Sequence, residues 1–245
     1  MIKLENTITP SPEQWISIIM GARNPMNSWA RSDSKIINQT LKEEEVCPGV
    51  TSLVSVSCTP YISIGPNDHE LLMKLAKGGS VHAKYRRMIN VYVDITAPLY
   101  WWKEFDTYKI GTVANSCSTM HKIHEKEFTL EDFSCEKLIQ YVETDDGECY
   151  PKERMYDLVE TLNVCREKFI QTKDKKYWDQ MIQLLPSSYN QKRTVELNYE
   201  VLVGLYRDRK NHKLDEWHVL CDWIEKLPCS ELIIGEKKEK NDETI

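Results

Sequence analysis

The clearest secondary-structure signal in the sequence lies in Ile89-Asn-Val-Tyr-Val-Asp-Ile-Thr-Ala-Pro-Leu-Tyr-Trp-Trp-Lys-Glu-Phe105. Apolar and polar residues alternate strictly from Ile89 to Ile95, which is the pattern of a strand with one buried face. Ala97-Pro98 then opens an aromatic helix that runs from Leu99 to Phe105. A strand that passes directly into a helix predicts a sheet with helices packed against it.

Upstream of this stretch the sequence predicts two helices, a loop and a second strand. Ser11-Pro12 is a typical helix start, with a capping serine and a proline in the first turn. The polar, turn-rich segment 21–33 predicts a loop with an exposed Trp29, and 50–58 predicts a strand. Asn67-Asp68 is expected to cap a helix that Gly78-Gly79 stops.

Downstream the pattern is mainly helical. The small, polar segment 111–121 predicts a loop, and 128–146 predicts a short acidic helix followed by a loop. The expected fold class is therefore α+β, a small sheet with antiparallel strands packed against helices, with one domain over 1–234 and a charged, disordered tail over 235–245. Four amphipathic helices are predicted in the C-terminal half, at 151–172, 175–185, 193–206 and 214–227.

Composition excludes several classes of protein. The chain has 245 residues, of which 41% are hydrophobic and 29% charged, so collagen, long disorder and a membrane-spanning protein are excluded. A net charge of −6 argues against broad nucleic-acid binding. Eight cysteines without a Cys-x-x-Cys pair, and a start without an apolar signal, indicate free thiols and a cytoplasmic location.

Three segments combine cations with aromatic rings, namely 82–87, 101–121 and 206–217. Arginine offers a planar fork to a phosphate, and an aromatic ring offers a stacking face to a base or an isoalloxazine ring. The alternative is that these are ordinary solvated helix ends and loops. His121 and His124 lack a third metal ligand, so no metal is expected, and Cys117 beside them is weak support for a Cys/His nucleophile.

At these segments the chain resembles the flavin-dependent thymidylate synthases of the ThyX type, and in particular divergent members of phage-like character, over about residues 60–227. The family motif is Arg-His-Arg-x-x-Ser-x-Asn-Glu-x-Ser-x-Arg-Tyr. At the same spacing this chain has Thr107-Tyr108-Lys109-x-x-Thr112-x-Ala114-Asn115-x-Cys117-x-Thr119-Met120. The order and spacing match well, whereas many identities differ. Further matches in order are Leu185-Pro186, Thr194-Val195-Glu196, Arg207 and Asp215-Glu216-Trp217.

The resemblance implies a specific activity. The family is a homotetramer whose active sites lie at subunit interfaces. It uses FAD, NADPH and methylenetetrahydrofolate to methylate deoxyuridine monophosphate (dUMP), and that scheme requires no protein nucleophile, so no catalytic residue is assigned. By this resemblance the candidate cofactor-binding residues are Arg86, Arg87, Tyr108, Lys109 and Asn115, and the candidate substrate-binding residues are Cys117, Ser118, Arg207 and Arg209.

The departures from the motif leave two other hypotheses open. Because only one cation of Arg-His-Arg survives, as Lys109, the chain is also compatible with a catalytically degenerate ThyX-fold protein that binds a nucleotide or a protein partner without flavin chemistry. The third hypothesis is a structural or assembly protein. Trp101, Trp102 and Trp217 are expected either at an oligomer interface or in the core of the protomer.

Overall fold

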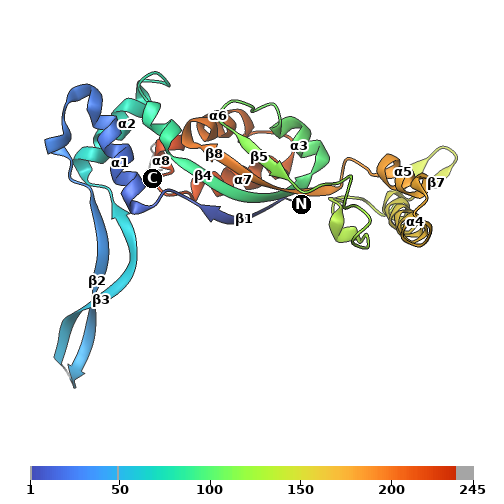
Figure 1. Ribbon diagram of the computed structural model, residues 1–245, viewed down its shortest axis with the longest axis horizontal. Helices are drawn as coiled ribbons and strands as arrows, with labels where there is room; N and C mark the ends of the chain where they lie inside the picture. The colour runs from blue at the N-terminus through green and yellow to red at the C-terminus, as the bar shows by residue number, and fades with distance from the viewer. Residues whose placement is uncertain (1, 49, 236–245) are drawn as a thin grey trace, which may run out of the picture. The chain divides into compact units, whose positions relative to one another are not determined.

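The computed structural model describes residues 2–48 and 50–235, with the side chains of 39–47, 50 and 52–58 outside the description (Figure 1). The predicted tail over 235–245 therefore lies outside the described residues beyond Gly235. The chain forms two compact units, unit 1 from residues 1–7, 93–195 and 213–220, and unit 2 from 8–92, 196–212 and the segment that begins at 221.

The elements have the following bounds. The strands are β1 (Lys3–Ile8), β2 (Lys35–Cys47), β3 (Val50–Ser63), β4 (Asn90–Pro98), β5 (Val113–Ser116), β6 (Val142–Thr144), β7 (Gly147–Cys149) and β8 (Asn190–Asn198). The helices are α1 (Pro12–Arg23), α2 (Pro66–Lys77), α3 (Leu99–Phe105), α4 (Pro151–Thr172), α5 (Lys175–Leu184), α6 (Tyr199–Arg209), α7 (Asp215–Glu225) and α8 (Glu231–Ile234). Four 3-10 turns are η1 (Asn24–Met26), η2 (Trp29–Arg31), η3 (Lys84–Met88) and η4 (Leu130–Asp132).

The main sheet has four strands in the order β1-β4-β8-β5. Strand β4 confirms the strand predicted from the alternation after Ile89, because Val91, Val93 and Ile95 are buried while the residues between them are more exposed. The carboxylate of Asp94 joins three strands of this sheet. It accepts hydrogen bonds from Asn6 Nδ2 of β1 (2.9 Å) and from Thr194 Oγ1 of β8 (2.6 Å), and it pairs with Lys192 Nζ (2.9 Å).

The sheet corrects two predictions. Residues 193–206 are not one helix, because β8 occupies 190–198 and α6 begins only at Tyr199. Val195 and Leu197 alternate with more exposed residues, which is a strand pattern that the helical spacing concealed, and Asn198 caps α6 by accepting a hydrogen bond from the Val201 amide. Residues 111–121 are not wholly a loop, because β5 is an edge strand whose four residues are all exposed.

An aromatic cluster forms the core of unit 1 beside α3. The ring centroid of Trp101 lies 4.7 Å from that of Trp217 and 5.1 Å from that of Phe105, and all three side chains are buried. Trp102 is also buried and donates its indole Nε1 to the carbonyl oxygen of Gln191 (2.9 Å). Of the two expectations for these tryptophans, the core of the protomer is therefore confirmed.

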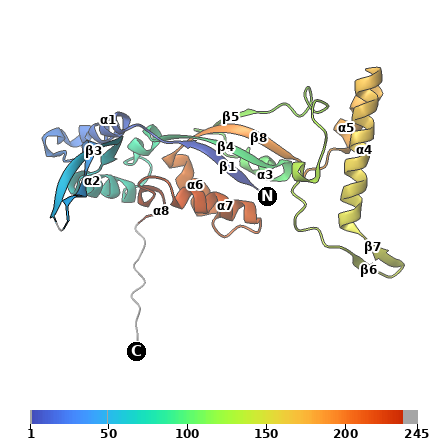
Figure 2. The same ribbon diagram turned by 90° about the horizontal axis from the view of Figure 1, so that it is seen from below.

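The helices α4 and α5 confirm two of the predicted amphipathic helices and lie side by side in unit 1 (Figure 2). The short acidic helix predicted in 128–146 is only the turn η4, and the hairpin β6–β7 follows it. The buried residues of this part are Ile123, Phe128, Phe133, Met155, Leu162 and Met181.

The helix α1 of unit 2 has Ser11 as its N-cap and Pro12 in its first turn, as predicted. Gln14 completes a capping box with Ser11 that was not predicted. The antiparallel hairpin β2–β3 contains the predicted second strand and a partner, β2, that was not predicted. The cap predicted at Asn67-Asp68 is wrong, because Gly65 is the N-cap of α2 and Asp68 is buried. None of the described helices combines the length and apolar character needed to cross a bilayer.

Candidate functional site

A hollow of about 200 Å³ lies where α3 passes into the segment with the motif spacing. It brings together two of the predicted cofactor-binding residues, Tyr108 and Lys109. We call it the Tyr108 hollow, and its lining residues are Phe105, Asp106, Tyr108, Lys109, Thr112 and Ala114.

The aromatic cluster fixes the position of this hollow. The Tyr108 amide donates to the carbonyl oxygen of Phe105 (3.0 Å), and the Tyr108 ring lies edge-on to the Trp217 ring at 6.3 Å. An ion pair holds Asp106, another lining residue, because Arg193 donates to its carboxylate (2.7 Å). The guanidinium of Arg193 lies over the Trp102 ring at 4.2 Å. One wall of the hollow is thus fixed by packing rather than by a free loop.

The polar groups of the Tyr108 hollow leave hydrogen-bonding capacity for a ligand. The hydroxyl of Thr112 is buried and has no hydrogen-bond partner among the described residues. Leaving a buried polar group unpaired costs about 1–3 kcal/mol, so a ligand that bonds to this oxygen recovers that free energy. Lys109 is exposed and adds a positive charge at the same place.

Three further predicted residues follow on or directly after β5. Asn115 is exposed. The amide of Cys117 donates to the Lys192 carbonyl (2.9 Å), while its thiol is free and exposed. Ser118 accepts a hydrogen bond from the His121 amide (2.9 Å), so its oxygen stabilises a turn.

The four predicted arginines belong to unit 2. Arg86 lies in η3 and is buried, with Nη1 3.8 Å from Oε2 of Glu200, and its Nε has no partner among the described residues. Arg87 beside it is exposed. Arg207 donates its Nε to Asp208 (2.8 Å) and is 74% exposed, whereas Arg209 is half-buried.

The structure does not bring Arg86 and Arg207 together. Glu200, the partner of Arg86, lies in the first turn of α6, whereas Arg207 and Arg209 lie in the last. Arg207 is seven positions after Glu200, which corresponds to about 10 Å along the axis of an α-helix. Within the protomer, unit 2 therefore has two separate groups of predicted cations at the two ends of one helix.

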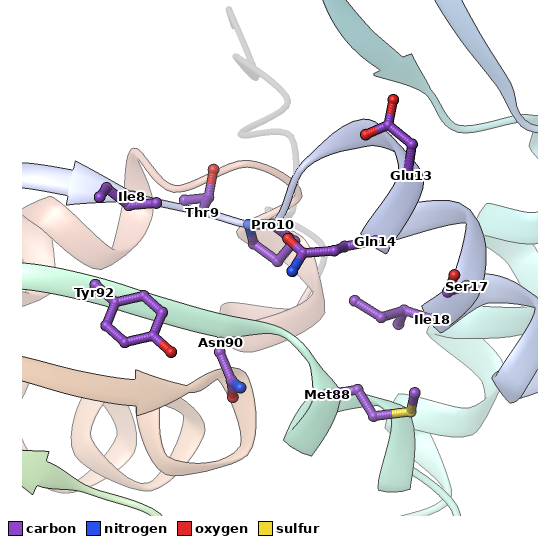
Figure 3. Close-up of a pocket in the computed structure, with 10 residues that line it drawn as sticks. All are labelled: Ile8, Thr9, Pro10, Glu13, Gln14, Ser17, Ile18, Met88, Asn90 and Tyr92. Atoms are coloured by element: carbon purple, nitrogen blue, oxygen red, sulfur yellow. The ribbon is translucent and has the colours of Figure 1, made fainter.

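A second, larger hollow of about 450 Å³ lies in unit 2. Figure 3 shows Met88, Asn90 and Tyr92 on one side of it and Gln14 and Ile18 of α1 on the other. We call it the Tyr92 hollow, and its lining residues are Ile8, Thr9, Pro10, Glu13, Gln14, Ser17, Ile18, Met88, Asn90 and Tyr92.

The charge of the Tyr92 hollow is negative. Glu13 is the charged residue of its described lining, and the hydrogen bond from Ser11 Oγ (2.8 Å) lowers the pKa of this carboxyl, so it stays ionised. The charge and hydrogen bond of Glu196 raise the pKa of Tyr92, so the phenol keeps its proton. These features disfavour a phosphate there, and none of the predicted site residues lines it.

Among the described residues, no group of three or more His, Cys, Asp or Glu is placed to hold a metal ion. Sequence reasoning did not assign Asp106 or Thr112 to the site. The motif spacing was the available signal for Thr112, which stands where the family has its first serine. Nothing in the sequence marked the residues of the Tyr92 hollow.

The fold of the chain has counterparts among solved structures. No protein-family model matches the chain, and no curated protein matches it. Among solved structures, thymidylate synthase X (ThyX) from Helicobacter pylori with FAD and dUMP has a TM-score of 0.59 and 16% identity, covering 96% of this chain and 97% of that one. The chain has a ThyX-like fold.

A second similar solved structure is a methylase by name. The UMP/dUMP methylase PolB from Streptomyces cacaoi, bound with 5-Br dUMP, has a TM-score of 0.51 and 11% identity, covering 92% of this chain and 88% of that one. Another structure of the Helicobacter pylori enzyme, complexed with FAD and dUMP, has a TM-score of 0.57 and 16% identity over the same coverage as the first. At these identities the likeness shows the ThyX-like fold alone.

Proposed function

We propose that the chain is a flavin-dependent, thymidylate-synthase-like enzyme that transfers a one-carbon group reductively to dUMP, with FAD, NADPH and methylenetetrahydrofolate. The observation that carries this proposal is a ThyX-like fold over 96% of the chain combined with the Tyr108 hollow at the position of the family motif. Solved structures with this fold contain FAD and dUMP or a brominated dUMP. The proposal includes a single ThyX-like domain over 1–234.

The residues of the Tyr108 hollow suit part of a flavin nucleotide. The unpartnered Thr112 hydroxyl and the Lys109 ammonium offer a hydrogen bond and a positive charge, and the Tyr108 ring offers an aromatic surface. A hollow of about 200 Å³ is too small for a whole dinucleotide, because sites for drug-sized ligands have volumes of about 300–1,000 Å³. The hollow therefore accommodates one end of the cofactor, and the remainder needs other residues.

The remaining predicted residues supply those contacts in this proposal. Arg86, Arg87 and Asn115 bind the other parts of the cofactor. Arg209, half-buried on α6, takes the phosphate of dUMP with Arg207 beside it, while Cys117 and Ser118 line the nucleotide. Because Arg86 and Arg207 lie at opposite ends of α6, we propose a homotetramer in which each site combines residues of several chains.

The flavin, when bound, supplies the redox chemistry of the reaction, as cofactors generally do. The residues of this chain bind and orient the flavin and the nucleotide, and they neutralise the charge of the phosphates. Lys109 and Arg87 are exposed cations that offset phosphate charge. The buried hydroxyl of Thr112 donates or accepts one hydrogen bond to the ligand. No protein nucleophile takes part.

A second candidate function is supported by one specific observation. Arg86, the best-buried cation of the predicted set, is paired with Glu200, which reduces the charge it offers to a flavin. Together with the loss of two residues of the Arg-His-Arg motif, this pairing favours a ThyX-fold protein that binds dUMP or a protein partner without flavin chemistry.

Two experiments distinguish these functions. In the first, the purified protein is titrated with FAD and with dUMP by calorimetry. Binding of both ligands supports the enzyme, and binding of dUMP alone supports the second candidate. Binding of neither contradicts the enzyme and leaves, of the second candidate, only the protein that binds a protein partner. In the second, NADPH oxidation is followed with dUMP and methylenetetrahydrofolate present, and turnover that needs FAD excludes the non-catalytic candidate.

A further inference from the structure

A buried ion pair forms the wall of a third hollow, in unit 2. Arg23, the last residue of α1, donates its Nε to Oδ1 of Asp68 on α2 across 2.5 Å, and their side chains are 3% and 0% exposed. The same guanidinium donates its Nη1 to the carbonyl oxygen (3.2 Å) and the hydroxyl oxygen (3.3 Å) of Ser28.

Asp68 also accepts hydrogen bonds from the segment 32–34. Its carboxylate accepts hydrogen bonds from the amides of Asp33 (3.0 Å) and Ser34 (2.9 Å) and from the hydroxyls of Ser32 (2.9 Å) and Ser34 (2.6 Å), in addition to Arg23. Asp68 is bonded to Arg23 through Nε, and Nη2 of the arginine is not among its donors, so the ion pair leaves that nitrogen unsatisfied.

Arg23 has donors to spare. Its Nη2, with two hydrogens, is buried and has no hydrogen-bond partner among the described residues. A guanidinium carries five N–H donors and no acceptor, so only an acceptor satisfies this nitrogen. A buried, charged donor without a partner costs more than a neutral one, which makes an oxygen ligand at Nη2 favourable.

Arg23 lines a hollow of about 370 Å³ that contains further donors, and we call it the Arg23 hollow. The Ser28 hydroxyl oxygen already accepts from Arg23, so its own hydrogen is available to a ligand. The lining also includes the cations Arg31 and Lys74 and Asn67, whose side chain ends in an amide. Glu70 is the acidic residue of the described lining. With Arg23 neutralised by Asp68, the balance of Arg31, Lys74 and Glu70 is one positive charge. The complete described lining is Arg23, Met26, Ser28, Arg31, Asn67, Glu70, Leu71, Lys74 and Leu75.

We infer that the Arg23 hollow binds a phosphate group, either as the free ion or as a phosphomonoester. A tetrahedral oxyanion presents oxygens in several directions, which suits donors that arise from α1, η2 and α2 rather than from one element. The volume exceeds what the phosphate group itself needs, so a substituent on the phosphate fits. This inference does not rest on the proposed function, because none of the predicted nucleotide- or flavin-binding residues lines the hollow.

The test is calorimetric titration of the full chain at constant ionic strength. Inorganic phosphate is the probe in one arm and AMP in the other, and the tighter of the two identifies the free ion or the phosphomonoester. We expect Arg31→Ala and Lys74→Ala each to weaken binding about fivefold, because each removes one exposed charge contact of about 1 kcal/mol. Glu70→Gln, which removes the opposing charge, is expected to strengthen binding.

A matched control lies on the same helix. Lys77→Ala removes a cation from α2 outside the Arg23 hollow and is expected to leave phosphate affinity unchanged. Arg23→Lys keeps the charge but removes the Nη2 donors, so it is expected to abolish binding while the far-ultraviolet circular dichroism stays that of the native protein. If Arg23→Lys fails to fold, the two surface variants and Glu70→Gln decide. Absence of binding to the unmodified chain, or equal weakening by Lys77→Ala and Lys74→Ala, overturns the inference.

Discussion

Tyr108 lies edge-on to Trp217, with ring centroids 6.3 Å apart and ring planes at 62°. The first residue belongs to the segment with the ThyX-like motif spacing and the second to α7 near the end of the chain. Trp217 in turn contacts the Trp101 ring of α3 at 4.7 Å and donates its Nε1 to Glu104 (3.2 Å). The aromatic cluster thus contacts a lining residue of the Tyr108 hollow through Trp217, so we expect changes at Trp217 to affect both stability and ligand binding.

Replacing Trp217 by alanine is expected to destabilise the protein by about 3–5 kcal/mol, the usual cost of truncating a buried tryptophan. Urea denaturation measures this change. Trp29→Ala is the matched control, because Trp29 is 43% exposed and its removal is expected to cost less than about 1 kcal/mol. Equal losses for the two variants would show that the cluster is not a core.

Lys109→Ala is expected to weaken FAD binding by about 1–2 kcal/mol, because it removes one positive charge from the Tyr108 hollow. Thr112→Val, which keeps the shape but removes the unpartnered hydroxyl, is expected to weaken FAD binding without lowering stability. Lys103→Ala on α3 is the control, since Lys103 is exposed and lies outside the hollow. Fluorescence titration of FAD provides the measurement, and an effect of Lys103→Ala as large as that of Lys109→Ala argues against the hollow.

Arg207→Ala and Arg209→Ala are each expected to weaken dUMP binding by about 1–3 kcal/mol, the cost of losing a charged hydrogen bond. We expect the larger effect from Arg209, because it is half-buried while Arg207 is 74% exposed and already paired with Asp208. Calorimetry with dUMP is the measurement, and Lys210→Ala, in the next position, is the control. Unchanged dissociation constants for both arginine variants remove them from the substrate site.

The Arg23–Asp68 pair predicts a dependence of stability on pH. Burial alone would raise the pKa of Asp68, but hydrogen bonds from Ser34, Arg23 and Ser32 outweigh it and lower the pKa from 3.8 to about 2. A group whose pKa is lower in the folded state adds stability above its unfolded pKa and loses it as the pH falls through the folded value. The free energy of unfolding is therefore expected to fall by about 2 kcal/mol between pH 4 and pH 2 on account of this residue.

Asp68→Asn tests that assignment in the same unfolding experiment. At neutral pH the variant is expected to lose about 3–5 kcal/mol, because Arg23 is then a buried charge without a counter-ion. Between pH 4 and pH 2 its stability is expected to change less than that of the unmodified chain. Parallel curves for the two proteins would assign the acid dependence to other carboxyls.

The cysteines are expected to differ in reactivity with a thiol reagent. Among the cysteines whose side chains the structure describes, Cys117 and Cys149 are exposed, so these two are expected to react first. Burial raises the pKa of Cys221 to about 11 and that of Cys229 to about 12, which leaves little thiolate at neutral pH, so both react slowly. Mass-spectrometric mapping of labelled peptides after short exposure measures the order, and early labelling of Cys229 would contradict it.

Local patterns were sufficient for much of the fold. The alternation that starts at Ile89 and the Ser11-Pro12 signal each specify one element, and β4 and α1 confirm them. The helix α4 has the bounds that its amphipathic period predicts. These elements were predictable because their residues follow a single period and carry clear start signals.

The failures have physical reasons as well. Residues 193–206 contain a strand followed by a helix. Val195 and Leu197 are two residues apart, which is a strand spacing, but Val195 and Leu202 are seven apart and Leu202 and Leu205 three apart, which are helical spacings, so periodicity alone did not separate the two elements. Strand β5 is an exposed edge strand without an apolar face, and its pairing in the sheet comes from tertiary structure. Asn67-Asp68 predicts a cap because Asn and Asp are common N-cap residues. In the structure Gly65 is the N-cap and Pro66 is the first residue of the helix, so Asp68 lies inside the first turn.

The candidate site was predictable only in part. The motif spacing predicted Tyr108 and Lys109 as site residues, and both line one hollow. Thr112 occupies a motif position and lines the same hollow, but it was not assigned to the site. It gave no information on the pairing of Arg86 with Glu200 or on the Arg23–Asp68 pair, because both join residues that are distant in sequence and carry no motif.

The decisive measurement for a flavin enzyme is the absorption spectrum of the purified protein, recorded before and after equilibration with FAD and removal of unbound cofactor. We expect the visible bands of oxidised flavin in the protein fraction, bleached by NADPH and perturbed by added dUMP. A colourless protein that retains no FAD and shows no response to dUMP would contradict it.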